Sequence, residues 1–198
     1  MPVFVALVIV AAALSIGTIS MVRMNGFSAR AEPSAVERLL ARAARRWAVP
    51  SAARDAINPM AFSPEVWSDS RAHFADHCAS CHANDGGGRT EMGQNLYPRA
   101  PDMRLPATQT LTDGELYWII ENGIRLTGMP AWGRGGPDDA DTWKLVHFIR
   151  RLKDLGPDEI NDMRALNPKT PGELEEERED QRFLAGETPD TPSSHAHH

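Results

Sequence analysis

The chain has 198 residues, 41% of them hydrophobic, which is enough for one modest domain with extensions. Its net charge of −6 lies mainly in residues 156–198, which carry 11 acidic and 4 basic side chains, so the remainder is close to neutral. No basic face with interleaved aromatic residues is present, which argues against a nucleic-acid partner. The chain's 2 cysteines are too close in sequence to form a stabilising disulfide, so their role is chemical.

An uncharged apolar segment runs from Val3 to Val22. At about 1.5 Å per residue in a helix, it spans a hydrocarbon core of roughly 30 Å. We therefore predict a transmembrane anchor at residues 1–24. The alternative is a cleaved signal peptide, with Ala-Arg-Ala at 29–31 as the cleavage site. However, a cleavable apolar region is usually about 7–15 residues long, and no basic leader precedes this one.

Residues 25–62 are predicted to form a basic amphipathic helix followed by a linker. Ser34 and Glu37 make a capping box at the start of the helix, and Pro50 ends it. The apolar positions recur at helical spacing, with arginines on the other face: Val36, Leu39, Leu40, Ala43 and Trp47. Two interpretations remain open, a helix lying on anionic lipid headgroups and a helix docked on the following domain.

A helical domain is predicted at residues 63–156. Ser63, followed by a proline and an acidic residue, begins its first helix. Thr112 begins a second helix, which Gly123 closes, and Asp141 begins the last one. The connections are rich in glycine and proline, and no strand pattern appears between them.

The end of the first of these helices carries the sequence Cys-Ala-Ser-Cys-His at 78–82. Cys-x-x-Cys-His is the attachment sequence of c-type haem, in which Cys78 and Cys81 bind the porphyrin covalently and His82 ligates the iron. Zinc is the main alternative, but the core offers no second ligand pair to complete a structural site. A thioredoxin-like redox site is disfavoured because no βαβ pattern surrounds the cysteines.

Met129 is the candidate for the second axial ligand. It follows His82 by 47 residues, and glycine and proline flank it. Glycine allows the backbone to approach a planar group, and proline restricts the loop that presents the sulfur. A methionine–histidine ligand pair raises the reduction potential of haem iron. Met92 and Met103 also lie in this region, and a methionine often only fills a gap in a core.

Five segments in a consistent order show a family resemblance over residues 63–155. They are CASCH, APDM, TDGELYWIIENGI, GMPAWG and DTWKLVHFIRRL. Together they resemble a class I c-type cytochrome, monohaem and of the bacterial membrane-anchored kind. The resemblance implies an all-α fold in which helices surround one covalent haem c, with Phe74 and Phe148 where the first and last helices cross.

The resemblance also implies roles for residues around the haem. A proline carbonyl would accept a hydrogen bond from Nδ1 of His82 and so orient its ring. Pro101 matches that position best, and Pro98 is the competing candidate. Four residues have suitable hydrogen-bond donors for the haem propionates, and their spacing in the sequence does not choose among them: Tyr97, Arg99, Arg125 and Trp132.

The function expected from these features is electron transfer by a membrane-tethered cytochrome, with iron cycling between Fe(III) and Fe(II) and with protein partners as electron donor and acceptor. No catalysis by the chain alone is expected. An alternative is a cytochrome subunit within a periplasmic dehydrogenase, oxidase or reductase complex. The expected location is the bacterial inner membrane, with the haem domain on the periplasmic side. Arginines after the anchor oppose this orientation under the positive-inside rule, but several lie far from the span.

Residues 157–198 are predicted to form an acidic, disordered tail, because periodicity is lost and charge dominates. The tail ends in His195, His197 and His198. Loose metal binding by these histidines would suit a haem or metal sensor, which is the least favoured function.

Overall fold

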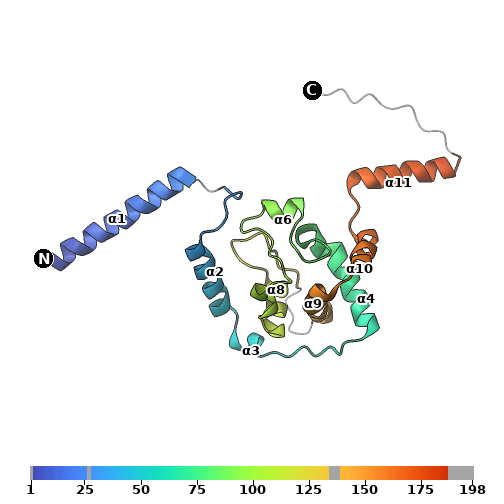
Figure 1. Ribbon diagram of the computed structural model, residues 1–198, viewed down its shortest axis with the longest axis horizontal. Helices are drawn as coiled ribbons and strands as arrows, with labels where there is room; N and C mark the ends of the chain where they lie inside the picture. Colours follow the sequence, from blue (N-terminus) through green and yellow to red (C-terminus); the bar gives the residue numbers. More distant parts are fainter. Residues whose placement is uncertain (1, 26–27, 134–138, 187–198) are drawn as a thin grey trace, which may run out of the picture.

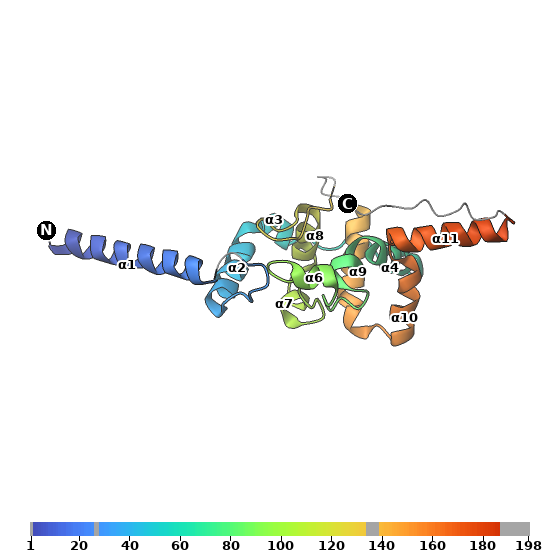
Figure 2. The ribbon, with the colours of Figure 1, turned by 90° about the horizontal axis from the view of Figure 1, so that it is seen from above.

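The computed structural model describes residues 2–25, 28–133 and 139–186, and every regular element within these ranges is a helix. The all-α prediction is therefore confirmed. Helices α1 and α11 extend from opposite ends of the group of helices that contains α4, α8 and α9 (Figures 1 and 2). The three C-terminal histidines, His195, His197 and His198, lie outside the described residues.

Helix α1, Pro2–Asn25, contains the predicted anchor. Among the described residues it is the one helix long and apolar enough to cross a membrane, and its apolar side chains are exposed. The hydroxyl groups of Ser15 and Thr18 donate to the backbone carbonyls of Ala11 and Leu14, which removes two unpaired donors from the apolar surface.

Two short elements connect α1 to the helical domain. Helix α2, Ala35–Ala48, begins at Ser34 with the predicted capping box, in which Ser34 and Glu37 bond each other's backbone amides. A single turn, α3, Ser51–Arg54, follows and packs against α8. Its residue Ala53 lies so close to Gly114 that a Cβ there would come within 1.8 Å of the Ala53 carbonyl oxygen.

The domain begins with a nearly continuous helical run. Ser63 caps α4, Pro64–His73, by accepting from the amide of Val66, as predicted. The run continues through a π-helical turn, η1, Phe74–Cys78, into α5, Ala79–His82. The later helices are α6, Glu91–Asn95; α7, Pro106–Gln109; α8, Asp113–Asn122; α9, Ala140–Arg151; and η2, Leu152–Asp154. Asp139, rather than Asp141, caps α9, and its carboxylate accepts two backbone amides.

The core lies where α4 and η1 cross α9. The rings of Phe74 and Phe148 are fully buried with their centroids 4.6 Å apart, so the predicted contact is confirmed. Trp67 extends this aromatic contact along α4, with its ring 5.3 Å from Phe148. Tyr117 of α8 stacks on Trp143 of α9 at 4.1 Å, which joins the third helix to the crossing.

The prediction of a disordered tail from residue 157 is wrong for the residues that the structure describes. Three helices follow η2: α10, Pro157–Asp162; η3, Met163–Leu166; and α11, Pro171–Leu184. Met163 is fully buried in the core, and the Asn167 side chain bonds Asn84 and the Ala75 carbonyl. One buried methionine and one amide make these contacts, so no apolar periodicity marks them in the sequence. Of these three helices, α11 alone is exposed throughout.

An ion-pair cluster closes the loop that follows α5. The guanidinium of Arg104 donates to both carboxylate oxygens of Asp102, at 2.8 and 2.7 Å, and to Asp85 at 2.8 Å. The amide of Met103 donates to the Gly86 carbonyl at 2.8 Å. Hydrogen bonds from Arg104 hold the pKa of Asp102 below its ordinary value. The cluster therefore fixes both ends of the segment between residues 85 and 104.

Replacing Met163 by alanine tests the extended core boundary. We expect Met163→Ala to lower the free energy of unfolding by about 2–5 kcal/mol, because it leaves a cavity in a fully packed site. Leu174→Ala, on the exposed helix α11, should change it by less than about 0.5 kcal/mol. Denaturant unfolding followed by circular dichroism measures both. Equal effects of the two variants would place residue 163 outside the core.

Removing the charge of Arg104 tests the ion-pair cluster. Because the pKa of Asp102 is lowered on folding, its stabilising effect is present above the ordinary value of 3.8 and is lost as the pH falls through the folded-state pKa. Arg104→Gln should cost about 1–3 kcal/mol at pH 7 and progressively less as the pH falls below 3.8. Thermal unfolding of the variant, the wild type and an exposed-site control, Lys153→Gln, measures this. A cost independent of pH would contradict the electrostatic origin.

Candidate haem site

The two cysteines lie at the junction of η1 and α5. Both are free thiols and partly exposed. Burial, and to a smaller extent the Cys81 thiol, raises the pKa of the Cys78 thiol to about 12. Cys78 is therefore protonated at neutral pH, unlike the thiolates of redox-active Cys-x-x-Cys sites. This favours a covalent attachment role over thiol–disulfide exchange.

A π-helical turn precedes the attachment sequence directly. In η1 the backbone bonds skip one residue more than in an α-helix, so the chain gains an extra residue over this turn. The extra residue changes the direction in which Cys78 leaves the helix axis relative to α4. Phe74 at the start of the turn stays in the core while Cys78 at its end reaches partly exposed space. No residue in the sequence signals this turn.

His82 has the surroundings of a ligand oriented by the backbone. Its Nδ1 atom is shielded from solvent and makes no hydrogen bond of ordinary geometry, but the Pro101 backbone lies close enough to interact with the ring. Burial lowers the pKa of His82, and the smaller opposing effect of Pro101 does not cancel it. The imidazole is consequently neutral at pH 7, with one ring nitrogen facing Pro101 and the other available to a metal. Among the prolines proposed for this role, Pro101 and not Pro98 adjoins the ring.

Gly88 permits the close approach of the Pro101 segment. It has φ +69°, and a Cβ there would lie 2.4 Å from the Ala100 oxygen and 3.1 Å from the Pro101 oxygen. Its amide donates to the His82 carbonyl at 2.8 Å. A side chain at position 88 would therefore push Pro101 away from His82.

Met129 lies in the loop between α8 and α9. Its amide donates to the Thr127 hydroxyl oxygen at 3.1 Å, and its carbonyl accepts from the Ile124 amide at 3.1 Å. The side chain is partly buried. The other candidate methionines differ, because Met103 is packed in the core and Met92 is exposed on α6. Of the three, Met129 has the surroundings best suited to a loop-borne ligand.

Contacts between loops bring these segments to one place. The ring of Trp132, in the Met129 loop, meets the ring of His77 edge-on at 5.6 Å, and His77 immediately precedes Cys78. Gly128 in the same loop abuts Leu96, and a Cβ on it would come within 2.5 Å of that side chain. The loops that carry Met129 and Pro101 are thus both adjacent to the attachment sequence.

Two of the candidate propionate donors already contact carboxylates of the N-terminal segment. The Tyr97 hydroxyl donates to Glu37, and Arg99 forms an ion pair of 2.7 Å with Glu32. The bond to Glu37 raises the pKa of Tyr97. Trp132 packs on His77 instead, as described above. These contacts join residues about 60 positions apart, and nothing in the sequence predicts them.

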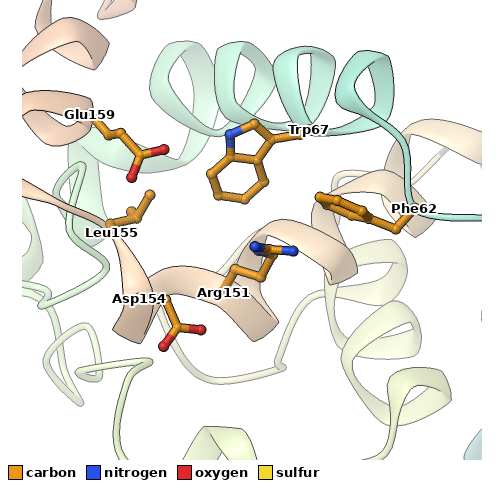
Figure 3. Close-up of a pocket in the computed structure, with 6 residues that line it drawn as sticks. All are labelled: Phe62, Trp67, Arg151, Asp154, Leu155 and Glu159. Carbon is orange, nitrogen blue, oxygen red and sulfur yellow. The ribbon is translucent and has the colours of Figure 1, made fainter.

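One cavity lies away from this region, and a second borders the attachment sequence at Ala79 and Ser80. The first, about 120 Å³, is lined by Phe62, Trp67, Arg151, Asp154, Leu155 and Glu159 (Figure 3). The Arg151 guanidinium lies over both aromatic rings, 4.6 and 5.5 Å from their centroids, so this space is too small and too occupied for a substrate. The second, about 370 Å³, is lined by Ala79, Ser80, Ala83, Asn84, Thr90, Arg164, Asn167 and Pro168. Neither is lined by Cys78, His82 or Met129.

The side chains present fit a covalently held haem better than zinc. Two free thiols precede a neutral histidine whose buried Nδ1 faces a backbone carbonyl group. Within residues 2–25, 28–133 and 139–186, no three His, Cys, Asp or Glu side chains gather as ligands of one metal ion. The zinc alternative therefore gains no support.

Comparison with known proteins identifies the domain. Residues 65–149 match the family model of cytochrome c oxidase, cbb3-type, subunit III, which is a c-type cytochrome family. No curated protein matches the chain. The matched range begins in α4 and ends in α9, so it includes the attachment sequence, Pro101 and Met129. Residues 65–149 are therefore a domain of a c-type cytochrome family, and such a domain implies electron transfer by a haem cytochrome.

Proposed function

We propose that the chain is a membrane-anchored monohaem cytochrome that passes single electrons between a donor protein and an acceptor protein. The observation that carries this proposal is the meeting of three segments: the attachment sequence, the Pro101 loop beside His82, and the Met129 loop against His77. Haem c supplies the Fe(III)/Fe(II) couple. The chain binds and orients the group and sets its surroundings.

Each residue of the site has a defined role in this proposal. Cys78 and Cys81 hold the group by thioether bonds, which prevents its loss. The Pro101 carbonyl, which already adjoins the ring, would accept from Nδ1 of His82 when haem is bound, and this bond would fix the ring and increase the basicity of the other nitrogen. Met129 would be the second residue to hold the iron, through its thioether sulfur, and a methionine–histidine pair would favour electron transfer over substrate binding. Tyr97, Arg99 and Trp132 are the proposed propionate donors.

The chain is proposed to carry electrons without performing a reaction of its own. Its buried carboxylates have structural partners: Glu115 bonds the Thr112 amide and pairs with Arg54, and Glu121 accepts from the Thr142 hydroxyl at 2.7 Å. They are therefore engaged in holding helices together. An electron carrier does not need buried carboxylates that are available for acid–base catalysis.

A second candidate function is that of a fixed cytochrome subunit in a larger redox complex. The observation in its favour is the matched family, whose name describes a subunit of an oxidase. In this case the donor or acceptor is a permanent neighbour rather than an encounter partner. Co-purification of a large catalytic subunit after mild solubilisation distinguishes the two.

The proposed location is the bacterial inner membrane, with the haem domain on the periplasmic side. Helix α1 supports the anchor by its length and apolar composition. The side of the membrane is argued from chemistry, because c-type haem is attached outside the bacterial cytoplasm. The anchor confines the domain near membrane-bound partners and raises its effective concentration there.

Replacing Met129 tests the axial ligand. Met129→Ala should abolish the iron–sulfur charge-transfer band of the oxidised protein and lower the reduction potential, because a methionine ligand favours the reduced state. Met92→Ala, at an exposed methionine on α6, should leave both unchanged. Absorption spectra and redox titration of the haem-loaded protein measure these effects. A band retained in Met129→Ala would assign the ligand to another residue.

Replacing both cysteines tests covalent attachment. In Cys78→Ser combined with Cys81→Ser, haem should dissociate under denaturing conditions, so that no haem-stained band remains on a denaturing gel. Ser80→Ala, between the cysteines, should keep the full signal. Haem staining that survives the double replacement would contradict thioether bonding.

A further inference from the structure

The orientation of α2 is unusual for a helix beside a folded domain. Its apolar side chains face away from the domain: Val36 is 66% exposed, Leu39 68%, Leu40 63% and Trp47 89%. With Ala43, which is also exposed, they form one continuous stripe along the helix. A contiguous exposed apolar face of this kind is typical of a surface that binds another protein or a membrane.

The polar side of α2 is the side held by the domain. Glu37 accepts from the Tyr97 hydroxyl, and partly buried Arg45 interacts with Glu115 of α8. At the helix end, Arg54 donates to the carbonyls of Arg46, at 2.7 Å, and Val49, at 3.2 Å. These contacts hold the helix by both ends, so its apolar stripe cannot turn inward while they persist. Docking on its own domain is thus not what covers the stripe.

The position of α2 in the chain places it close to the end of the proposed anchor. Only residues 26–34 separate it from α1, a span of at most about 30 Å when fully extended. From residue 23 to residue 48 the chain carries six arginines and two glutamates. Arg38, Arg42 and Arg46 recur every four residues and so form a basic row beside the apolar stripe. An apolar stripe bordered by arginines is the pattern of a helix that lies in a lipid headgroup layer.

We propose that α2 lies flat in the headgroup region of an anionic lipid bilayer, with its apolar stripe inserted and Arg38, Arg42 and Arg46 on lipid phosphates. This inference rests on the proposed anchoring through α1. It goes beyond anchoring because it fixes the orientation of the haem domain relative to the membrane. Glu37 and Glu32 tie this helix and the segment before it to Tyr97 and Arg99, so the loop leading to Pro101 is held toward the membrane surface. The electron partner must then present its redox group near that surface.

Site-directed spin labelling of the full, haem-loaded chain in lipid vesicles tests the position of α2. The native cysteines are consumed in thioether bonds, so a single new cysteine can be labelled. We choose Leu40→Cys on the apolar stripe and Ala41→Cys on the side facing the domain. Leu14→Cys in α1 and Phe183→Cys in exposed α11 serve as reference positions for the bilayer and for water. Collisions with oxygen and with a neutral nickel chelate report depth in phosphatidylcholine vesicles with and without phosphatidylglycerol.

We expect the label at Leu40 to be accessible to oxygen and shielded from nickel in vesicles containing phosphatidylglycerol, as at Leu14. The label at Phe183 should show the reverse, and that at Ala41 should lie shallower than that at Leu40. Replacing Arg38, Arg42 and Arg46 together by glutamine should move the Leu40 label toward water and leave the haem spectrum unchanged. No movement in that variant would overturn the role of the arginines.

Other results separate this inference from the proposed function. A nickel-accessible label at Leu40 with an immersed label at Leu14 overturns the inference and leaves the anchor in place. A label at Leu40 shielded from both reagents, in detergent as well as in lipid, shows that protein covers the stripe and also overturns it. A water-exposed label at Leu14 contradicts the anchor itself, and with it both proposals.

Discussion

The approach of the Pro101 backbone to His82 is the constraint on which the rest of the haem region depends. An imidazole can be buried at low cost only in its neutral form and with its N–H group facing an acceptor. Gly88 makes the approach possible, because any side chain there would strike the backbone at residues 100 and 101. The Arg104 cluster and the Met103–Gly86 bond then hold the loop closed. The imidazole of His82 is thus the side chain around which this loop is arranged.

The helices supply a rigid frame for that loop and for the Met129 loop opposite. The buried Phe74–Phe148 contact locks the start of the π-helical turn, so the extra residue of the turn displaces its far end, where Cys78 lies. Gly123 ends α8 at φ +64°, and a Cβ added there would clash with backbone atoms of residues 129–131. The frame therefore fixes the backbone on both sides of the site before any cofactor is bound, which limits reorganisation during electron transfer.

The N-terminal segment links the position of the domain to the chemistry of the site. Glu32 and Glu37 contact Arg99 and Tyr97, two side chains that are also the proposed partners of acidic propionates. The two glutamates and the haem propionates would thus use the same hydrogen-bond donors, Arg99 and Tyr97. A membrane-bound α2 would set the distance and tilt of the haem domain, while α1 would only limit how far it can diffuse. Buried Met163 shows that the segment after α9 also belongs to this unit, up to the hydrogen bonds of Asn167.

Local chemistry could be predicted from the sequence, and contacts between distant residues could not. The capping boxes at Ser34–Glu37 and Thr112–Glu115 involve groups three residues apart, so the helix starts follow from the residues themselves. The Cys-x-x-Cys-His sequence at residues 78–82 predicts haem attachment for the same reason, because its residues are adjacent in the chain. The Arg104 cluster, the burial of Met163 and the outward apolar face of α2 depend on partners far along the chain. Helical periodicity determines that α2 has an apolar face, but only tertiary structure decides which way that face points. The hydrogen bond between Glu37 and Tyr97 and the bonds from Arg54 to the end of the helix set its rotation.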